Sequence, residues 1–397
     1  MAYLNECDIE EADIKFFLEN LNYDKHINAW KDELVGRDSL KEVVLKQNLK
    51  KALKNLNPNL PQISISFAIE ELTKSRVSLS EFEANEEIYN YLQNGIFHTF
   101  KNSDGKEEST YIKIIGYDKE DKIHNEFLVL SQLTIEYLSS TGKRRPDLIL
   151  YINGLPLVML ELKNASVKIK SGYDSNLQTY RRDIPQLFYY NLCVSISNGH
   201  QTRLGSFNAP WEHFFSWAKL EDNITNKNQD GLLLLEQKSK KEDSRLSLQR
   251  LCEGLFSKEH FVDYLENFVL YHKKKIKVIA KNHQFLGVNR AIENFENKDN
   301  DGRLGVFWHT QGSGKSYSMI YFSKKIRRRI TGNWSFLIIT DRNDLDDQIF
   351  KNFCDTKTIN LGAGEKTDNN QYRAKGNRSR KQLQESLKEN KSYYFST

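Results

Sequence analysis

Three ionisable residues, Asp147, Glu161 and Lys163, stand in an otherwise apolar stretch that reads RPDLILYINGLPLVMLELKN. Burying charged groups among apolar side chains is costly unless a ligand compensates for it. Two carboxylates on one face suit a hard divalent cation such as Mg²⁺. A lysine beside them could orient a water molecule and offset charge on an attacked phosphate. The residue types therefore indicate metal-dependent phosphate chemistry, and an exposed edge hairpin with a surface ion pair is the alternative.

The stretch has the pattern of a β-hairpin, with Asn153-Gly154 between two apolar runs. Side chains alternate between faces along a strand, so the register decides whether the two carboxylates meet. A strict two-residue loop pairs Asp147 with Leu160 and sends Glu161 to the opposite face. A three-residue loop that includes Leu155 pairs Asp147 with Glu161 instead. We predict the longer loop or a compensating bulge, because only these bring the carboxylates together.

A second candidate site is the glycine-rich segment from Thr310 to Ser316, TQGSGKS. It follows a predicted strand at 303–309 and precedes a predicted helix, which is the context of a phosphate-binding P-loop. The backbone N–H groups of such a loop surround phosphate, the lysine reaches the β/γ oxygens and the hydroxyl ligates Mg²⁺. We therefore expect nucleotide binding by Thr310, Gly312, Ser313, Gly314, Lys315 and Ser316, with Ser316 as a metal ligand. The first glycine of the full pattern is replaced by His309. A structural glycine turn does not account for Lys315 and Ser316 together.

The elements that must position these residues have an α/β pattern. Helical stretches alternate with short breaks over residues 1 to about 60, β-rich segments follow at 111–117 and 125–130, and the hairpin comes next. Residues 172–182 are predicted to form a helix and residues 191–197 a buried strand. A further amphipathic helix is predicted at 256–275, and a second buried strand of the P-loop unit at 335–340. We expect a mixed sheet flanked by helices, followed by a second α/β unit.

Length and composition bound the possibilities. A chain of 397 residues predicts two or three domains, and 39% apolar residues suffice for packed cores. The dense polar run at 219–245 places the boundary between domains 1–245 and 246–397. No apolar run reaches the roughly 18–20 residues that cross a bilayer, and the acidic N-terminus lacks a secretory signal, so we expect a cytoplasmic protein with no membrane partner. The four scattered cysteines indicate neither a zinc site nor a disulfide framework, and a net charge of +5 permits nucleic acid without arguing for it.

Together these motifs resemble the N-terminal portion of the motor (R) subunit of Type I restriction enzymes. The resemblance covers nearly the whole chain. It rests on the segments LNPNLP, RRPDLILYINGLPLVMLELKN, RRDIPQLFYYN, SNGHQTRLGS, NHQFLGVNRAI, FWHTQGSGKS and IITDRNDLDDQIF. It implies a PD-(D/E)xK endonuclease domain followed by a RecA-like P-loop helicase lobe. In this family the motor pulls double-stranded DNA with ATP, the nuclease cuts it, and separate modification (methylase) and specificity subunits complete the complex.

The resemblance also implies residue roles. Asp147 and Glu161 would hold Mg²⁺, Lys163 would assist catalysis, and Gln284 would recognise the adenine of ATP. Related nucleases carry a Gln-x-x-x-Tyr pair on the helix after the hairpin. Here Tyr180 fits, but the position four residues earlier is Asn176, a shorter amide. Gln178 would face elsewhere on a helix. Glu86 is a further acidic candidate on a helix that precedes the hairpin.

The chain stops inside a predicted third motor strand, before any Asp-Glu-x-His segment and before a second lobe. Phosphoryl transfer needs those parts, so the sequence predicts that this chain does not translocate DNA by itself. Two other hypotheses stay open. One is a module that binds DNA or the methylase without chemistry, and the other is a nucleotide hydrolase unrelated to DNA. Metal-dependent cleavage distinguishes the leading hypothesis from the first, and salt-dependent DNA binding excludes the second.

Overall fold

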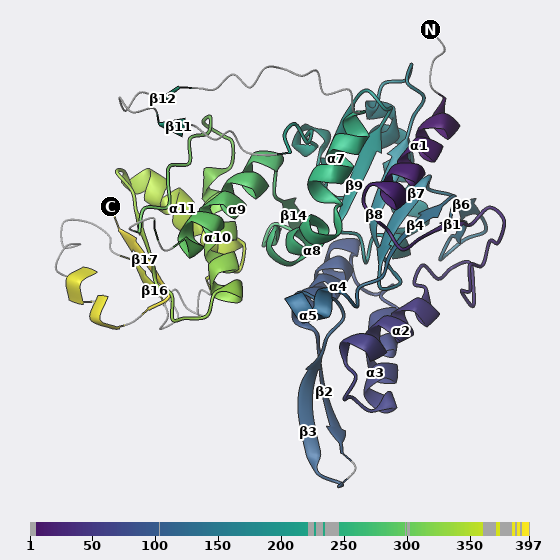
Figure 1. The fold of residues 1–397 in the computed structure, drawn as a ribbon, viewed down its shortest axis with the longest axis horizontal. Helices are drawn as coiled ribbons and strands as arrows, with labels where there is room; N and C mark the ends of the chain where they lie inside the picture. The colour runs from purple at the N-terminus through teal and green to yellow at the C-terminus, as the bar shows by residue number, and fades with distance from the viewer. Residues whose placement is uncertain are drawn as a thin grey trace. The chain divides into compact units, whose positions relative to one another are not determined.

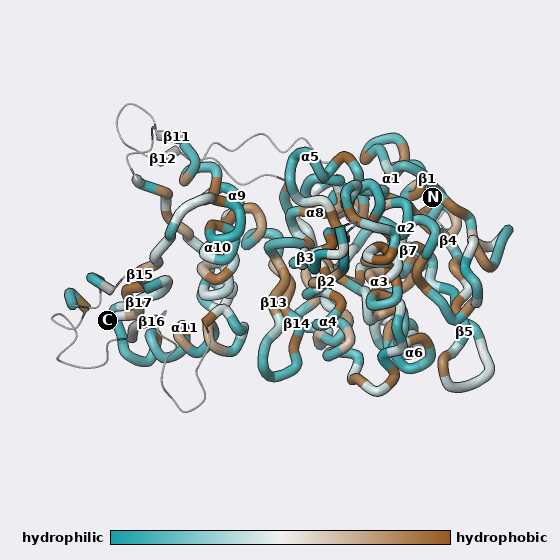
Figure 2. The backbone as a smooth tube through the Cα atoms, turned by 90° about the horizontal axis from the view of Figure 1, so that it is seen from below, coloured by the Kyte–Doolittle hydropathy of each residue, from teal (hydrophilic) through white to brown (hydrophobic). Residues whose placement is uncertain are grey.

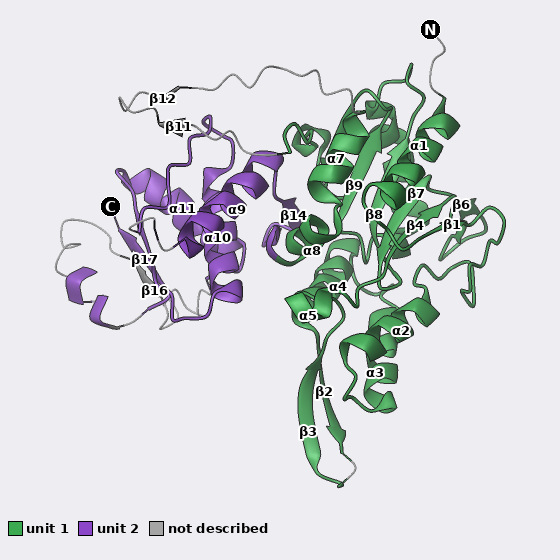
Figure 3. Cartoon of the chain, in the orientation of Figure 1, with its two compact units in different colours: residues 1–266 green, residues 267–397 purple. Residues whose placement is uncertain are grey.

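The structure is a computed structural model that describes residues 5–102, 104–220, 226–227, 233–234, 246–297, 299, 302–359, 371–373, 383–385, 387–389 and 391–396. It divides into two compact units, residues 1–266 and 267–397 (Figure 3). The division therefore comes later than the sequence-derived boundary at 245. Residues 246–266 belong to the first unit because Tyr23 and Tyr89 donate hydrogen bonds of 2.9 Å to the carbonyls of Phe256 and Leu265.

The first unit holds twelve described strands and a set of helices (Figure 1). The strands are β1 (Lys25–Asn28), β2 (Ile96–Lys101), β3 (Glu107–Ile112), β4 (Phe127–Ser131), β5 (Ile135–Glu136), β6 (Lys143–Arg144), β7 (Leu148–Ile152), β8 (Leu155–Leu162), β9 (Cys193–Ser197), β10 (Thr202–Gly205), β11 (Asn226–Lys227) and β12 (Leu233–Leu234). The α-helices are α1 (Glu6–Glu19), α2 (Lys46–Leu56), α3 (Gln62–Thr73), α4 (Glu81–Asn94), α5 (Lys119–Lys122), α6 (Gln178–Asp183), α7 (Ser247–Leu255) and α8 (Lys258–Asn267), with a π-helical turn at Gly172–Leu177 directly before α6.

A six-stranded mixed sheet in the order β1-β4-β7-β8-β9-β10 forms the centre of this unit, as the sequence predicted. β1 runs parallel to β4 and β8 parallel to β9, whereas β7 is antiparallel to both of its neighbours. Every residue of β4, β7, β8 and β9 is buried, which explains their nearly continuous apolar runs. Apolar stretches accordingly gather in the middle of the unit around β7 (Figure 2). These directions bring the ends of β1, β4 and β8 and the start of β7 to one sheet edge.

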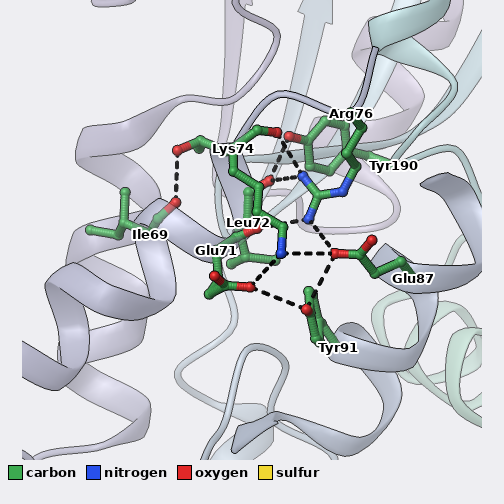
Figure 4. Close-up of polar contacts among 9 residues, drawn as sticks. Ile69, Glu71, Leu72, Lys74, Arg76, Glu87, Tyr91 and Tyr190 are labelled. Atoms are coloured by element: carbon green, nitrogen blue, oxygen red, sulfur yellow. Dashed lines mark hydrogen bonds and ion pairs between the residues drawn. The ribbon is translucent and has the colours of Figure 1, made fainter. Parts of the chain in front are cut away.

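A buried guanidinium joins α3 to α4 (Figure 4). Arg76 is 2% exposed and donates hydrogen bonds to the carbonyls of Glu71, Leu72 and Lys74, which end α3 without helical partners. It also pairs with Glu87 of α4 at 3.2 Å. This network fixes the position of α4, whose first residue Glu81 then binds α6.

The second unit contains a three-stranded parallel sheet in the order β15-β17-β16. Its elements are β13 (Val269–His272), β14 (Ile276–Ile279), α9 (Asn282–Glu296), α10 (Lys315–Arg329), β15 (Phe336–Ile339), α11 (Asn343–Asp355), β16 (Gln371–Arg373) and β17 (Tyr393–Ser396). The predicted helix after the P-loop and the predicted second strand are confirmed as α10 and β15.

Two sequence predictions for this part of the chain are wrong. The helix expected at 256–275 ends at Asn267, because residues 269–272 pair with residues 276–279 as a hairpin and Lys275 takes a φ of +60° in its turn. Residues 303–309, all of which the structure describes, do not form the predicted strand. The described residues there have no hydrogen-bonded neighbour strand, and Val306 and Trp308 are 88% and 91% exposed.

Among the described residues, none of the helices is long and apolar enough to cross a membrane.

Candidate functional site

One unpaired residue sets the register of the central hairpin. The loop is the two-residue Asn153-Gly154, with φ values of +53° and +78°, so the predicted three-residue loop is wrong. Tyr151 pairs with Pro156 but Leu150 pairs with Val158, which leaves Leu157 as a bulge. The alternative prediction, a compensating bulge, is therefore confirmed. Continued past Leu148 and Leu160, this register places Asp147 opposite Glu161.

The Asp147 carboxylate lies at the start of β7 and is bound to the end of β8. Its Oδ2 accepts a hydrogen bond of 2.7 Å from the backbone N–H of Leu162. Its Oδ1 lies 3.5 Å from Nε2 of Gln132, a residue just after β4. Burial raises the pKa of Asp147, and the Leu162 hydrogen bond and the charge of Lys163 oppose that rise.

Glu161 is 1% exposed and lies beside Lys163, whose Nζ donates to Glu161 Oε1 at 2.7 Å and to the carbonyl of Leu162 at 2.8 Å. Glu161 Oε2 is buried without a hydrogen-bond partner. Burial, reinforced by the charge of Asp147, raises the pKa of Glu161 to about 8. Burial lowers the Lys163 pKa, but the two carboxylates outweigh it and the pKa is raised overall. The pair is thus a buried acidic centre with one cation.

The helix after the hairpin brings Tyr180 and Asn176 to this centre. The Tyr180 hydroxyl lies 3.5 Å from the carbonyl of Arg145, and burial and the Glu161 charge raise its pKa. A side-chain hydrogen bond from Asn176 opposes that rise. Gln178 points elsewhere, to the carbonyl of Tyr173 and to Arg181, in agreement with the sequence prediction.

A close backbone approach makes this arrangement possible. A Cβ on Gly172 would lie 2.8 Å from Cγ2 of Ile196, with Glu161 and Lys163 atoms next beyond. The π-helical turn that starts at Gly172 therefore packs directly over the acidic centre. At the far end of the segment, Arg181 pairs with Glu81 of α4 at 2.7 Å.

Sequence reasoning missed the contribution of α1. Glu10 Oε2 accepts a hydrogen bond of 2.6 Å from Gln132 Nε2, and burial and the nearby charge of Asp147 act together to raise the Glu10 pKa. Glu6 binds the backbone N–H of Asn164 at 3.0 Å. The helix acid at this centre therefore comes from α1, whereas the candidate Glu86 lies on α4. The acidic run EEAD was visible in the sequence, but the sequence does not reveal that α1 contacts β8.

The donor set fits a divalent cation in part. The unpaired Glu161 Oε2 and the neighbouring Asp147 Oδ1 are hard oxygen donors of the kind Mg²⁺ prefers. The part of the chain that the structure describes contains no group of three or more His, Cys, Asp or Glu side chains that could hold a metal. Water and phosphate oxygens would therefore supply the remaining ligands, as is usual for Mg²⁺.

The second candidate site is the glycine-rich loop that precedes α10. Gly312 and Gly314 have φ values of +78° and +87°, and Gly314 caps α10, which begins at Lys315. Lys315 Nζ donates to the carbonyls of His309 and Thr310 at 2.8 and 3.1 Å. Ser316 follows in the first turn of the helix. A lysine held at the mouth of such a loop by carbonyls is available to a bound phosphate.

Gln284 packs against this loop. Its Nε2 donates to the carbonyl of Gly314 at 2.9 Å, its Oε1 accepts from the backbone N–H of Lys281 at 2.8 Å, and the residue is 3% exposed. The neighbouring His283 hydrogen-bonds the carbonyl of Ser313 at 3.0 Å. Both the oxygen and the nitrogen of the Gln284 amide are thus hydrogen-bonded to backbone groups, and the bond to Gly314 holds the glycine-rich loop.

Comparison with known proteins matches the chain to two family models and to several curated relatives. The family model described as Type I restriction enzyme R protein N terminus matches residues 3–213, and one described as SWI2/SNF2 ATPase matches residues 283–397. The chain is 33% identical over 368 residues to the putative type I restriction enzyme MjaIXP endonuclease subunit of Methanocaldococcus jannaschii, covering 89% of this chain and 34% of the relative.

Two further relatives agree. The type I restriction enzyme HindI endonuclease subunit of Haemophilus influenzae is 33% identical over 371 residues, 90% of this chain and 33% of the relative. The type I restriction enzyme SauCOLORF180P endonuclease subunit of Staphylococcus aureus is 25% identical over 268 residues, 66% of this chain and 26% of the relative. The chain thus spans about a third of the length of the first two of these curated relatives. With more than half of its residues matched by the family model, this chain belongs to the family of Type I restriction enzyme R proteins.

Proposed function

We propose that the first unit is a PD-(D/E)xK endonuclease that hydrolyses phosphodiester bonds of double-stranded DNA with Mg²⁺. The observation that carries the proposal is Glu161 Oε2, which is buried and unpaired beside Asp147 and Lys163. Leaving a buried carboxylate oxygen unsatisfied is costly, and a metal ligand would remove that cost. The names of the curated relatives, which are endonuclease subunits, support the same assignment.

The chain's own residues divide the work in this proposal. Asp147 and Glu161 would hold Mg²⁺, which when bound would polarise the phosphate and a water molecule. Lys163 lies 2.7 Å from Glu161, so it offsets the negative charge that gathers as a phosphate approaches two carboxylates. Tyr180 and Asn176 would orient the Glu161 carboxylate. Gln132 and Glu10 would fix the position of Asp147 from the opposite side.

For the second unit we propose ATP binding by the P-loop. Lys315 would exchange its two carbonyl partners for phosphate oxygens, Ser316 would ligate Mg²⁺, and Thr310, Gly312, Ser313 and Gly314 would line the loop. We assign Gln284 to holding the loop instead of recognising adenine, because its amide is buried and already bonded at both ends. The relatives are about three times as long as this chain. We therefore propose DNA translocation, and assembly with modification and specificity subunits, only for a protein of that full length.

A second candidate function is binding of DNA or of the methylase subunit without cleavage. The observation that favours it is Asn176, whose side chain is one methylene shorter than the glutamine expected there. A shorter amide that orients Glu161 less well would lower the rate without changing the fold.

Nicking of supercoiled plasmid by the purified chain with Mg²⁺ or Mn²⁺ tests the proposal. Asp147→Ala and Lys163→Ala should each abolish nicking. Asp174→Ala is the matched control, because Asp174 lies on the same π-helical turn, 55% exposed and paired with Lys170. Nicking that survives both site variants contradicts the assignment. An inactive chain that Asn176→Gln also leaves inactive favours the binding module.

A further inference from the structure

The sheet edge that carries the nuclease carboxylates also carries a loop that the proposed chemistry does not use. β1 is parallel to β4, so the loop at 29–37 begins beside the residues that follow β4. Ala29 N–H donates to the carbonyl of Ser131 at 3.0 Å, and Gln132 N–H donates to the carbonyl of Asp147 at 2.9 Å. Backbone contacts thus link the loop after β1 to the catalytic strand.

An exposed indole in this loop makes a cation–π contact with an arginine. The Arg145 guanidinium lies 4.0 Å from the ring centroid of Trp30, and Trp30 is 63% exposed. A single exposed aromatic residue is ordinary on a protein surface. This one is distinguished by its partner, because Arg145 stands two residues before Asp147 and its carbonyl lies 3.5 Å from the Tyr180 hydroxyl. Arg145 therefore contacts the nuclease site through its backbone carbonyl, while its guanidinium extends to Trp30 and donates to Thr134 Oγ1 at 3.1 Å.

Two basic side chains converge on one carboxylate here. Glu33 lies 3.4 Å from Lys143 Nζ and 3.5 Å from Arg145 Nη2. The side chains of Lys143, Arg145 and Glu33 are 47%, 31% and 44% exposed, so solvent and ligands reach all three. An exposed ion pair of this kind contributes little to stability. Lysine and arginine side chains also bind phosphate oxygens, so the two cations that hold this carboxylate have the chemistry of a phosphate contact.

The loop is held rigidly in this position. Arg37 is 4% exposed and donates to the carbonyls of Glu33, Leu34, Glu42 and Thr134. Val35, two residues before Arg37, has a φ of +52°, which is strained for a β-branched side chain. Backbone strain persists only where surrounding contacts enforce it, and it gathers at functional sites. A buried arginine that enforces strain beneath an exposed Trp–Arg pair indicates a preorganised contact surface.

We propose that Arg145 and Lys143 bind a backbone phosphate of duplex DNA beside the nuclease centre. Trp30 orients the Arg145 guanidinium, and Glu33 occupies the phosphate position until DNA displaces it. This inference rests on the proposed nuclease function and names the residues that hold its substrate. Phosphate contacts of this type position DNA without reading its sequence.

Binding of a short fluorescent duplex to the whole chain, in Ca²⁺ and over a salt series, tests the proposal. Arg145→Gln is expected to weaken binding about tenfold, the size of one charge-assisted hydrogen bond. Arg145→Gln and Lys143→Gln should each reduce the slope of log affinity against log salt by about 0.9. Trp30→Ala should weaken binding about threefold, because only the cation–π contact is lost. Glu33→Gln should instead tighten binding about threefold, since it removes the competing carboxylate.

The matched control is Arg203→Gln. Arg203 lies 5.0 Å above the ring of Trp211, on β10 at the opposite end of the strand order, and should leave affinity and salt slope unchanged. Equal effects of Arg145→Gln and Arg203→Gln, weaker binding by Glu33→Gln, or no binding by the unaltered chain would each overturn the proposal. Plasmid nicking distinguishes failure of the phosphate-contact proposal from failure of the nuclease assignment. If Asp147→Ala abolishes nicking while Arg145→Gln and Lys143→Gln bind and nick normally, the phosphate contact fails and the nuclease assignment stands.

Discussion

Asp147 accepts a hydrogen bond of 2.7 Å from the backbone N–H of Leu162, so one carboxylate both faces the proposed metal position and ties β7 to the end of β8. An asparagine at position 147 could still accept this hydrogen bond, whereas an alanine could not. We expect Asp147→Asn to keep the stability of the first unit, whereas Asp147→Ala should lose about 1.5–3 kcal/mol, the range for a hydrogen bond to a charged group. Both variants should lose nicking. Urea unfolding and plasmid nicking of the two variants check this, and equal stability would contradict the structural role.

Metal affinity should depend on pH through Glu161. Its pKa is raised to about 8 by burial, so below that pH the carboxyl group keeps a proton that a metal must displace. Affinity for Mn²⁺ is therefore expected to increase about tenfold per pH unit up to about pH 8 and then to level off. Calorimetry in two buffers of different ionisation enthalpy measures the released proton. Affinity independent of pH between 6 and 8 would show that Glu161 is not the ligand that titrates, and Glu161→Gln should abolish the dependence.

Stability should fall as pH rises because of Asp13. This residue of α1 is 1% exposed, both of its carboxylate oxygens lack hydrogen-bond partners, and burial raises its pKa to about 8. Between the ordinary aspartate pKa and that value the folded state holds a proton that the unfolded state has released. The free energy of unfolding therefore decreases by about 1.4 kcal/mol for each pH unit across this window because of Asp13.

Asp13→Asn should remove that part of the pH dependence, so the variant gains stability over the unaltered chain most strongly near pH 8. Urea unfolding at a series of pH values measures it. Glu19→Gln, an exposed acid on the same helix, is the control and should leave the slope unchanged. An unaltered slope in Asp13→Asn would mean that the carboxyl group is ionised in the folded protein.

The two P-loop glycines should differ in their tolerance of a side chain. Gly312 and Gly314 both have positive φ, so alanine costs about 1–2 kcal/mol of backbone strain at either position. A Cβ on Gly312 meets open space, but one on Gly314 would lie 2.7 Å from Gln284 Nε2. Gly314→Ala should therefore also displace Gln284 from the loop. Fluorescent ATP-analogue binding is expected to fall further in Gly314→Ala than in Gly312→Ala, and equal losses would contradict the packing role of Gln284.

Local chemistry made part of the fold predictable. Asn153-Gly154 specifies a tight turn because both positions tolerate positive φ, and Lys315 marks a helix start because the loop before it has the required glycines. The choice between a longer loop and a bulge was open, since both place Asp147 opposite Glu161. The structure has the bulge, and its unpaired residue, Leu157, is fully buried.

Tertiary contacts decided what the sequence could not. Periodicity favoured a helix through Lys275, but pairing of residues 269–272 with 276–279 outweighed helix propensity. A strand at 303–309 required a hydrogen-bonded neighbour, and the described residues supply none. Glu10 reaches the acidic centre through its hydrogen bond to Gln132, a contact between residues 122 positions apart that local sequence patterns do not reveal.

The bulge at Leu157 has a consequence for folding. The Asn153-Gly154 turn is equally compatible with a regular hairpin in which Leu160, and not Glu161, stands opposite Asp147. Both faces of β8 are buried, so alternation of polar and apolar residues does not protect the native register against a slip of one residue. The hairpin formed alone therefore has a competing misregistered state with its two acids on opposite layers. β9 follows β8 in the chain and pairs Val158 with Cys193. We therefore expect the docking of β9 to favour the native register, in which Asp147 and Glu161 stand opposite each other.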